Sequence, residues 1–426
     1  MISLTMLGIF SVLAVLGMPL AFALGWAGLG GVLLGGFPME QLAGKMVYAL
    51  DSFPLMAIPL FMLAGQLMVR GGIMERLIEL ADAAVGRVTG GLGLVTIGAA
   101  MGLSSVSGSS VADATALGST LGPSLGKSYS KGFGAALVAS ASNLGPIIPP
   151  SIGMIVYAVV ARDVSVGYLF VAGIVPGIFL GLGTMVLCAV IARRRGYPVS
   201  GEAFSTARVV RELRRSLIVF LMPVLVIGGI VGGVFTATEG AAIAVAYALA
   251  IGFFVTRKLR LSDLLPCLLN AAIITAIVGA LIAFSSQVTY LLTAEMVAPQ
   301  VAEWLTTVTT DPLLFTFLVM LMLVLVGMVM EANAAYLMLV PIIAPIAAMY
   351  GIDPVYFGFL VVMNITIGGI TPPVGILLIV TSGIWRIKVT EIIREATPFI
   401  VLQYALLFLF TLFPDIILFL PRLLGY

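Results

Sequence analysis

The chain alternates long apolar runs with short polar connections from one end to the other. Runs of about 20 apolar residues recur, which is the length that a helix needs to cross a bilayer. Two of these runs are interrupted, one in each half, at Asn143–Gly153 and Asn364–Gly375, by Asn, Gly, hydroxyl residues and a Pro-Pro pair. Unwound backbone at membrane depth must be buried in protein or face a watery cavity. We therefore predict an all-α integral membrane protein with two broken transmembrane helices.

Each interrupted run follows a segment that we expect to enter and leave the membrane on one side, as a re-entrant helical hairpin. A hairpin and a broken helix in each half, in opposite orientations, form an inverted repeat, and such breaks are the best sequence pointer to the binding site of a secondary transporter. We expect one polytopic membrane domain over 1–426, with a first repeat over 1–215 (hairpin 91–125, broken helix 131–160) and a second over 216–426 (hairpin 312–348, broken helix 355–384).

The placement of charge predicts the orientation. Lys and Arg gather in five places, which the positive-inside rule assigns to the cytoplasmic side: Arg70 to Arg87, Lys127 and Lys131, Arg193 to Arg215, Arg257 to Arg260, and Arg386 to Arg394. Residues 291–312 carry acids and no base, so we expect them outside, together with the N-terminus and two short spans before residue 37. Amphipathic stretches at 40–50, 73–85 and 298–308 fit either lateral interfacial helices or ordinary surface linkers.

Composition narrows the function. Hydrophobic residues make up 61% of the chain and charged residues 9%, against about 25% charged in soluble domains. No polar tract is long enough for a soluble domain. The sequence has no histidine, and Cys188 and Cys267 lie in apolar runs. A histidine-dependent triad and a His or Cys metal cluster are excluded. We expect no enzyme activity and no organic cofactor.

The first hairpin tip concentrates hydroxyls, with five serines between Ser104 and Ser110. Hydroxyls and freed carbonyls suit a small hard cation, and the alternative is close helix packing by small residues. Asp113 lies ten residues before Pro123, just as Glu331 lies ten residues before Pro341. Carboxylates inside a membrane segment usually have a paired or functional role. Each could contact an ion or substrate, or cap the returning half-helix.

The two breaks place helix ends in the membrane. Carbonyls at the end of a half-helix that stops at Asn143 could hold a cation, and the half-helix that we expect to begin at Pro149-Pro150 could face an anion. In the second break Thr371 is the expected N-cap before Pro372-Pro373. The alternative is a pair of proline kinks. Thr236 to Glu239 matches a capping box and predicts a helix start.

Five blocks together resemble the large membrane subunit (DctM type) of the tripartite ATP-independent periplasmic transporters, the TRAP family: Gly102–Gly126, Asn143–Gly153, Gly232–Tyr247, Gly327–Pro345 and Asn364–Gly375. The resemblance implies an elevator-type, sodium-driven importer of an organic anion in a bacterial or archaeal inner membrane, with sodium as coupling ion. It implies as partners a small four-helix membrane subunit (DctQ type) and a periplasmic substrate-binding protein (DctP type). Membrane lipid surrounds the chain, and no nucleic acid is expected.

Carried over onto this sequence, the resemblance implies a first sodium site at Ser104, Ser107, Asn143 and Gly145 and a second at Gly327, Thr366, Gly369 and Thr371. The remaining candidates for substrate contact or gating come from the hairpin tips and the breaks: Ser105, Ser109, Asp113, Pro149, Pro150, Glu331, Asn333, Pro372 and Pro373.

Three other functions compete with this one. A stand-alone sodium/anion symporter shares broken helices and hairpins, a channel could use the same Ser and Gly filters, and an intramembrane enzyme would need a nucleophile that does not accompany Asp113 and Glu331. The substrate stays open among C4-dicarboxylates, sialic acids and other carboxylated metabolites.

Overall fold

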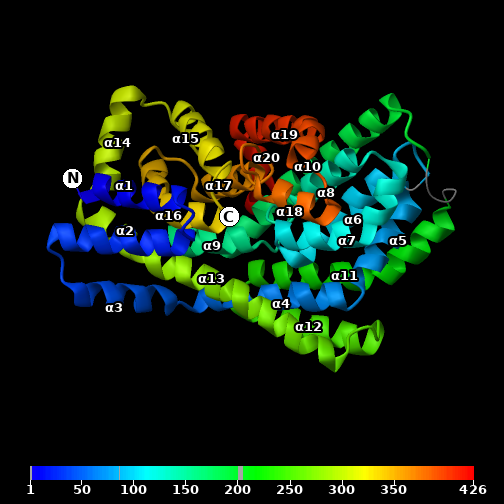
Figure 1. Ribbon diagram of the computed structural model, residues 1–426. Helices are drawn as coiled ribbons and strands as arrows, with labels where there is room; N and C mark the ends of the chain where they lie inside the picture. The colour runs from blue at the N-terminus through cyan, green and yellow to red at the C-terminus, as the bar shows by residue number, and fades with distance from the viewer. Residues whose placement is uncertain (1, 86, 200–204) are drawn as a thin grey trace.

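The computed structural model describes residues 2–85, 87–199 and 205–426, and every regular element within them is a helix (Figure 1). The all-α fold expected from the apolar pattern is present. Within these ranges seven helical segments are long and apolar enough to cross a membrane. An eighth is counted if α14 (Val297–Val308) and α15 (Pro312–Gly327), which meet at 117°, form one span. The chain is a multi-pass membrane protein.

A layer of long helices packs around α13 (Leu261–Ala294) along the left and lower sides of Figure 1. The helices in contact with α13 are α1 (Ile2–Val15), α2 (Leu20–Gly35), α3 (Met39–Leu50) and α4 (Ala57–Arg70). The 3-10 turn η1 (Phe53–Met56), α12 (Ala237–Ala250) and the π-helical turn η2 (Ile251–Val255) complete the layer by packing on α4. Small residues let α2 and α13 approach, since a Cβ on Gly28 would lie 2.7 Å from Gln287 Oε1. The capping box predicted at the start of α12 is present, between Thr236 and Glu239.

The first hairpin and the first broken helix follow each other in the first half. The helices are α5 (Ile73–Val85), α6 (Gly91–Ser107), α7 (Ser110–Ser128), α8 (Lys131–Ser142), α9 (Ile152–Ala161), α10 (Val166–Arg194) and α11 (Thr206–Val231). The hairpin arms α6 and α7 pack together and turn at Gly108, whose φ of 61° favours glycine. Residues 143–151 separate α8 from α9.

The second half repeats this arrangement. Helices α15 and α16 (Ala332–Met349) form the hairpin, α17 (Pro354–Gly368) and α18 (Ile376–Trp385) form the broken helix, and α19 (Val389–Leu412) and α20 (Pro414–Leu423) end the chain. Asp311 and Asp353 cap α15 and α17 just before a proline at the first helical position, where proline fits best. Helix α19 packs against both α8 and α17, so it contacts both broken helices.

The half-helices after the breaks begin later than the sequence predicts. Helix α9 begins at Ile152 and not at Pro149-Pro150, because Ser151 is its N-cap and its hydroxyl accepts the Met154 N–H. A residue before proline is pushed out of helical geometry, so the helix starts only after the pair. Helix α18 begins at Ile376 with Gly375 as N-cap. The prediction that Thr371 caps it is wrong, because the Thr371 hydroxyl donates back to the Ile367 carbonyl of α17.

Contacts between distant segments separate two sides of the molecule. Bases from three of the five clusters form ion pairs with acids far away in the sequence: Arg70 with Asp263, Lys258 with Glu75, Arg195 with Glu395 and Arg208 with Asp82. Elsewhere the Ser3 N–H donates to Glu295 and the Tyr426 hydroxyl donates to Asp353. The N-terminus therefore shares a side with the acidic segment before α15, as the charge pattern predicts. We call the side that holds the N-terminus and the acidic segment the outer side, and the side that holds the basic clusters the inner side.

Candidate functional site

The tip of the first hairpin encloses a carboxylate. Asp113 in the first turn of α7 is fully buried and accepts hydrogen bonds from two hydroxyls of α6. Ser104 Oγ lies 3.1 Å from Asp113 Oδ2, and the Ser107 hydroxyl donates to the other carboxylate oxygen. Within the described residues no Lys or Arg pairs with Asp113. The helix cap is Ser109, not Asp113, so the carboxylate instead ties the two arms of the hairpin together.

The first break lies directly against this tip. A Cβ on Gly145 would lie 2.8 Å from Asp113 Oδ2 and 3.0 Å from the Ser109 carbonyl carbon. A Cβ on Gly108 would lie 2.7 Å from the Pro150 carbonyl oxygen. Side chains larger than glycine would push the tip and the break apart. Ser104, Ser107 and Gly145 of the predicted first sodium site thus meet around Asp113, at a place that we call the first junction, and Asn143 lies two residues before Gly145 in the same break.

The end of α8 adds oxygens that lack partners at the first junction. Asn143 is the last-turn cap of α8, and its Nδ2 donates to Gln403 Oε1 of α19 at 2.8 Å. Gln403 Nε2 in turn donates to the Ser140 carbonyl at 3.3 Å. The buried Asn143 Oδ1 and Ser140 Oγ have no hydrogen-bond partner. Leaving a buried acceptor unsatisfied costs free energy, so these oxygens are available to a cation.

The second hairpin and the second break meet through backbone. A Cβ on Gly368 would lie 2.4 Å from the carbonyl carbon of Gly327, and the Gly375 N–H points to the Met328 carbonyl oxygen at 3.4 Å. The Gly369 carbonyl accepts the Leu377 N–H across the break at 2.9 Å. We call this contact the second junction. It holds Gly327, Gly369, Thr366 and Thr371, the residues of the predicted second sodium site.

Tyrosines from neighbouring helices reach the hydroxyls of the second junction. The Tyr336 hydroxyl of α16 lies 3.5 Å from Thr366 Oγ1, and the Tyr404 hydroxyl of α19 lies 3.2 Å from Thr371 Oγ1. A Cβ on Gly153 of α9 would lie 3.2 Å from the Tyr336 ring. Tyr336 therefore links the half-helix after the first break to the second junction.

The second carboxylate behaves differently from the first. Glu331 is the N-cap of α16, as the capping alternative predicts, and accepts the Ala334 N–H at 3.1 Å. Its other oxygen accepts from Asn333 Nδ2 at 2.8 Å. Both partners belong to the arm that Glu331 itself begins. This carboxylate therefore orders its own helix end and does not join the two hairpin arms.

The other predicted residues lie around the junctions without joining the polar clusters. The Ser105 hydroxyl donates to the Gly102 carbonyl within α6 at 2.7 Å, away from Asp113. Pro149 and Pro150, like Pro372 and Pro373, lie in the non-helical breaks, and both Pro-Pro bonds are cis.

Sequence reasoning missed Gln403 and Tyr404. These neighbours on α19 reach the first and the second junction respectively. Gln403 is fully buried in the largely apolar second part of α19, residues 398–412. Buried polar side chains inside membrane segments are rare and need a partner, so a glutamine in this run was the available signal.

The donor set of the first junction fits a hard monovalent cation. It offers a carboxylate, hydroxyl oxygens with free lone pairs and an amide oxygen, and hard cations prefer oxygen ligands. A buried carboxylate without a cationic partner is costly, and a bound cation would neutralise it. The second junction offers Thr366 Oγ1, backbone carbonyls and, nearby, the partnerless Asn364 Oδ1. Ends of half-helices and unwound carbonyls are the usual cation ligands of secondary transporters.

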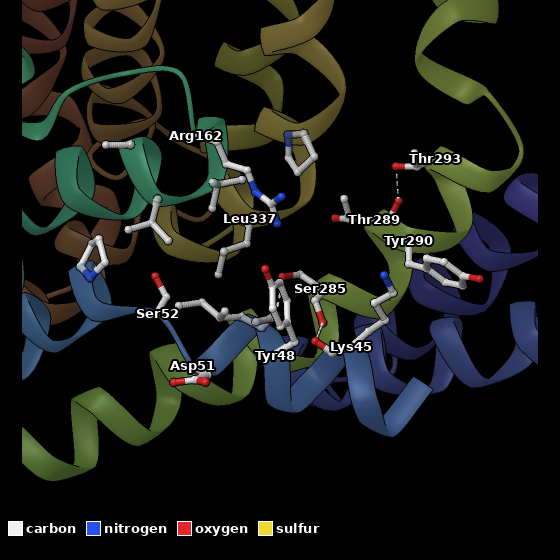
Figure 2. Close-up of a pocket in the computed structure, with 18 of the residues that line it drawn as sticks. Lys45, Tyr48, Asp51, Ser52, Arg162, Ser285, Thr289, Tyr290, Thr293 and Leu337 are labelled. Atoms are coloured by element: carbon white, nitrogen blue, oxygen red, sulfur yellow. Dashed lines mark hydrogen bonds between the residues drawn. The ribbon is translucent and has the colours of Figure 1, made fainter. Parts of the chain in front are cut away.

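Two cavities flank the broken helices, one toward each side. The outer cavity, of about 710 Å³, lies between α3 and α13 on one side and α9 and α16 on the other (Figure 2). The inner cavity, of about 550 Å³, lies between α7 and the end of α18 and is lined by Lys127, Lys131 and Trp385. In each cavity the end of one broken helix faces the returning arm of the other hairpin. The two cavities occupy corresponding places in the two halves.

Comparison with known proteins gives a consistent result. Residues 7–416 match the family described as tripartite ATP-independent periplasmic transporter, DctM component. The isethionate TRAP transporter permease protein DctMQ of Oleidesulfovibrio alaskensis is 37% identical over 414 residues, which cover 97% of this chain and 65% of that protein. This chain thus spans less than two thirds of the length of DctMQ.

A second relative matches over nearly its whole length. The C4-dicarboxylate TRAP transporter large permease protein DctM of Pseudomonas aeruginosa is 38% identical over 388 residues, which cover 91% of this chain and 90% of that protein. Among solved structures, the YdaH transporter of Alcanivorax borkumensis superposes with a TM-score of 0.63 at 15% identity, over 88% of this chain and 87% of YdaH. At that identity the likeness concerns the fold alone.

Proposed function

This chain belongs to the family of DctM components of tripartite ATP-independent periplasmic transporters, and from that membership we propose that it is the large permease subunit of a sodium-coupled importer of an organic anion. It is a multi-pass protein of the inner membrane, and its relatives are transport permeases and not enzymes. The substrate is a carboxylated anion such as a C4-dicarboxylate or a sialic acid, delivered by a periplasmic binding protein.

One observation carries the proposal. Each half brings a hairpin tip against a helix break, and the first junction holds a fully buried carboxylate whose polar partners are hydroxyls. An uncompensated charge in a low-dielectric layer is strongly disfavoured. An empty site would therefore cross the membrane poorly, whereas a site neutralised by sodium would cross. This difference couples the sodium gradient to movement.

Sodium and substrate use opposite ends of the half-helices. The end of α8 presents oxygens to the cation, and the first N–H groups of α9 and α18 present partial positive charge to the anion. We call these N–H groups the anion edge. Because α9 and α18 begin later than the sequence predicts, the anion edge lies in the turns that follow Ser151 and Gly375 and not at Pro149 and Pro372. Sodium orders the tip and the break together, which aligns those N–H groups with the anion.

The proposed partners follow from the family. A small four-helix subunit of the DctQ type completes the membrane part, and the amphipathic helices α3, α5 and α14 are its proposed docking sites. A periplasmic binding protein of the DctP type delivers the substrate from the outer side. In the elevator mechanism that we propose, the hairpins and broken helices move against the layer around α13.

The test is uptake of radiolabelled organic acids into proteoliposomes that contain this chain and its small subunit. Succinate, isethionate and N-acetylneuraminate are compared with an inward sodium gradient and with choline in place of sodium, each with and without the cognate binding protein. We expect uptake only when both sodium and the binding protein are present. Uptake without the binding protein would favour a stand-alone symporter, and flux that ignores sodium would favour a channel.

A matched pair of serines tests the ion site itself. Ser140 and Ser142 are both fully buried on α8, but Ser140 Oγ has no partner, whereas Ser142 Oγ donates to the Val138 carbonyl at 2.7 Å. We expect Ser140→Ala to raise the sodium concentration that half-saturates uptake and Ser142→Ala to leave it unchanged. Equal effects of the two substitutions would contradict the proposed role of the partnerless oxygens.

A further inference from the structure

The outer cavity has the chemistry of an anion site that neither junction uses. We propose that it receives the organic anion before transport, with the guanidinium of Arg162 as the main contact for the carboxylate or sulfonate group. The proposal rests on the proposed function for the kind of ligand. A volume of about 710 Å³ falls within the range of small-molecule sites, about 300–1,000 Å³.

Arg162 is placed for this role by the end of the first broken helix. It is the residue after α9, and Figure 2 shows its side chain reaching into the cavity above Leu337. Its guanidinium forms no ion pair or hydrogen bond with any described residue. A φ of 65° is unusual for a residue other than glycine. Arginine forms paired hydrogen bonds to carboxylates and sulfonates through its planar fork of N–H groups.

The opposite wall supplies a second positive charge and hydroxyls. Lys45 of α3 lies with its Nζ 5.0 Å from the centre of the Tyr290 ring, so an aromatic ring holds it at the cavity wall. Ser285 and Thr289 of α13 face the same space (Figure 2). Asp51 is the one carboxylate among the lining residues, and in Figure 2 it lies toward the lower left, apart from the Arg162 side chain.

The position of the cavity connects it to transport. Arg162 and Leu337 belong to a broken helix and a hairpin, whereas Lys45 and Thr289 belong to the layer around α13. Helix α9, which ends just before Arg162, begins just after the first junction. An anion held in this cavity therefore contacts both the layer around α13 and the part formed by the broken helix and the hairpin. It lies at the outer end of α9, and the first turn of α9 is the proposed anion edge.

A competing explanation is that Arg162 merely complements the negative end of α9, where a basic residue is favourable. Arg162→Gly removes the cation from both places but keeps the backbone, because glycine adopts a positive φ without strain. A role at the helix end affects stability, whereas a role in the cavity affects the access and binding of anions, which the two experiments below measure. Arg162→Lys keeps the charge but loses the planar fork.

The first experiment needs neither a known substrate nor sodium. A cysteine is introduced at Thr289→Cys in the complex with the small subunit, and its labelling by a sulfonate-bearing and by a trimethylammonium-bearing methanethiosulfonate is timed. The native Cys188 and Cys267 are buried and give the background in the parent protein. We expect Arg162→Gly to lower the ratio of anionic to cationic labelling rates about tenfold, since a positive cleft concentrates anions at least that much. Arg162→Lys keeps the ratio.

The matched control is Arg422→Gln. Arg422 is another arginine of the outer side, held by Asp415 and outside the cavity, and we expect its loss to leave the ratio unchanged. An unchanged ratio in Arg162→Gly would overturn the proposal, as would an equal fall in Arg422→Gln. This result does not depend on whether transport is driven by sodium.

The second experiment measures uptake of the substrate that the proteoliposome assay identifies. We expect Arg162→Gly to raise the KM about tenfold with little change in maximal rate, and Arg162→Lys to raise it less, because a receiving site contributes binding and not movement. A fall in maximal rate with unchanged KM would assign Arg162 a structural role and overturn the proposal. Absence of sodium dependence, with the KM effect intact, would overturn the proposed coupling and leave the anion site standing.

Discussion

The two junctions share a topology but hold their parts together by different chemistry. In the first, a buried carboxylate accepts hydroxyls from the opposite arm, and partnerless oxygens lie beside it. In the second, the carboxylate of Glu331 orders only its own helix, and tip and break meet through the backbones of Gly327 and Gly368. Two repeats with the same arrangement of helices therefore need not use the same side-chain interactions.

The difference indicates how each junction responds to an ion. The first contains a buried carboxyl group whose polar partners are hydroxyls, so its free energy depends strongly on a bound cation. The second is fixed by close backbone contact, which does not change with charge. We therefore expect bound sodium to stabilise mainly the first junction, and the stability of the second junction to depend mainly on the steric fit between its backbones.

The largest effect is expected from Asp113→Asn. The amide keeps the size of the side chain but removes the charge that a cation would neutralise. We expect sodium affinity to fall about tenfold to a hundredfold, because an interaction with a charged group contributes about 1.5–3 kcal/mol, and sodium-driven uptake to fall with it. The measurement is the sodium dependence of the unfolding midpoint of the purified complex, together with uptake.

Glu331→Gln is the matched control for this change, because it removes the other hairpin carboxylate. Its partners are the neighbouring Ala334 N–H and Asn333, so we expect sodium affinity to change far less. Equal losses in the two variants would show that the junctions do not differ in their dependence on charge.

Gly368→Ala tests the backbone contact of the second junction. The new Cβ would lie 2.4 Å from the Gly327 carbonyl carbon, and backbone cannot move aside as a side chain can. We expect destabilisation by about 1–3 kcal/mol, the usual cost of overpacking, and a lowered unfolding midpoint with or without sodium.

The adjacent Gly369→Ala is the control, because its Cβ would meet only the Thr366 carbonyl oxygen at 3.2 Å and Leu377 at 3.9 Å. We expect a smaller loss there. If Gly369→Ala were the more harmful change, the assigned contact between tip and break would be incorrect.

A smaller effect is expected from Ser151→Ala. The Ser151 hydroxyl accepts the Met154 N–H and donates to the Pro146 carbonyl at 2.6 Å, so it closes the first break, whereas the second break has a glycine in that place. Loss of a helix cap costs about 1 kcal/mol. Thermal unfolding should show this loss, and Ser165→Ala should show almost none, since Ser165 caps α10 without a side-chain hydrogen bond. Similar shifts for the two serines would contradict this role.

The smallest effect is expected from Tyr404→Phe. It removes one hydrogen bond, of 3.2 Å, to Thr371, which keeps its bond to the Ile367 carbonyl. A net loss of about 0.5–1.5 kcal/mol is typical, and we expect the low end. Gln403→Leu, at the neighbouring position, leaves the Asn143 amide without its partner and should lower the unfolding midpoint more. The reverse order would place the more important α19 contact at the second junction.

Much of the fold could be predicted from local patterns. The apolar runs, the interruptions at Asn143–Gly153 and Asn364–Gly375 and the glycines and serines of the first tip indicate helices, breaks and a turn, because each depends on nearby residues. The exact start of α9 was missed because both the Pro-Pro pair and Ser151 suit a helix start, although the restriction on the residue before proline and the Ser151 hydroxyl cap both favour the later one.

The sequence by itself determined that this is a polytopic helical membrane protein with two interrupted helices and a carboxylate in each hairpin, since hydrophobicity and helix-breaking residues act locally. Only the tertiary structure decided which groups meet. It turned Asp113 toward Ser104 and Ser107, brought Gly368 against Gly327, and placed Gln403 and Tyr404 of α19 at different junctions. It also formed the outer cavity around Arg162. These contacts join residues far apart in the chain, and their geometry depends on how whole helices pack.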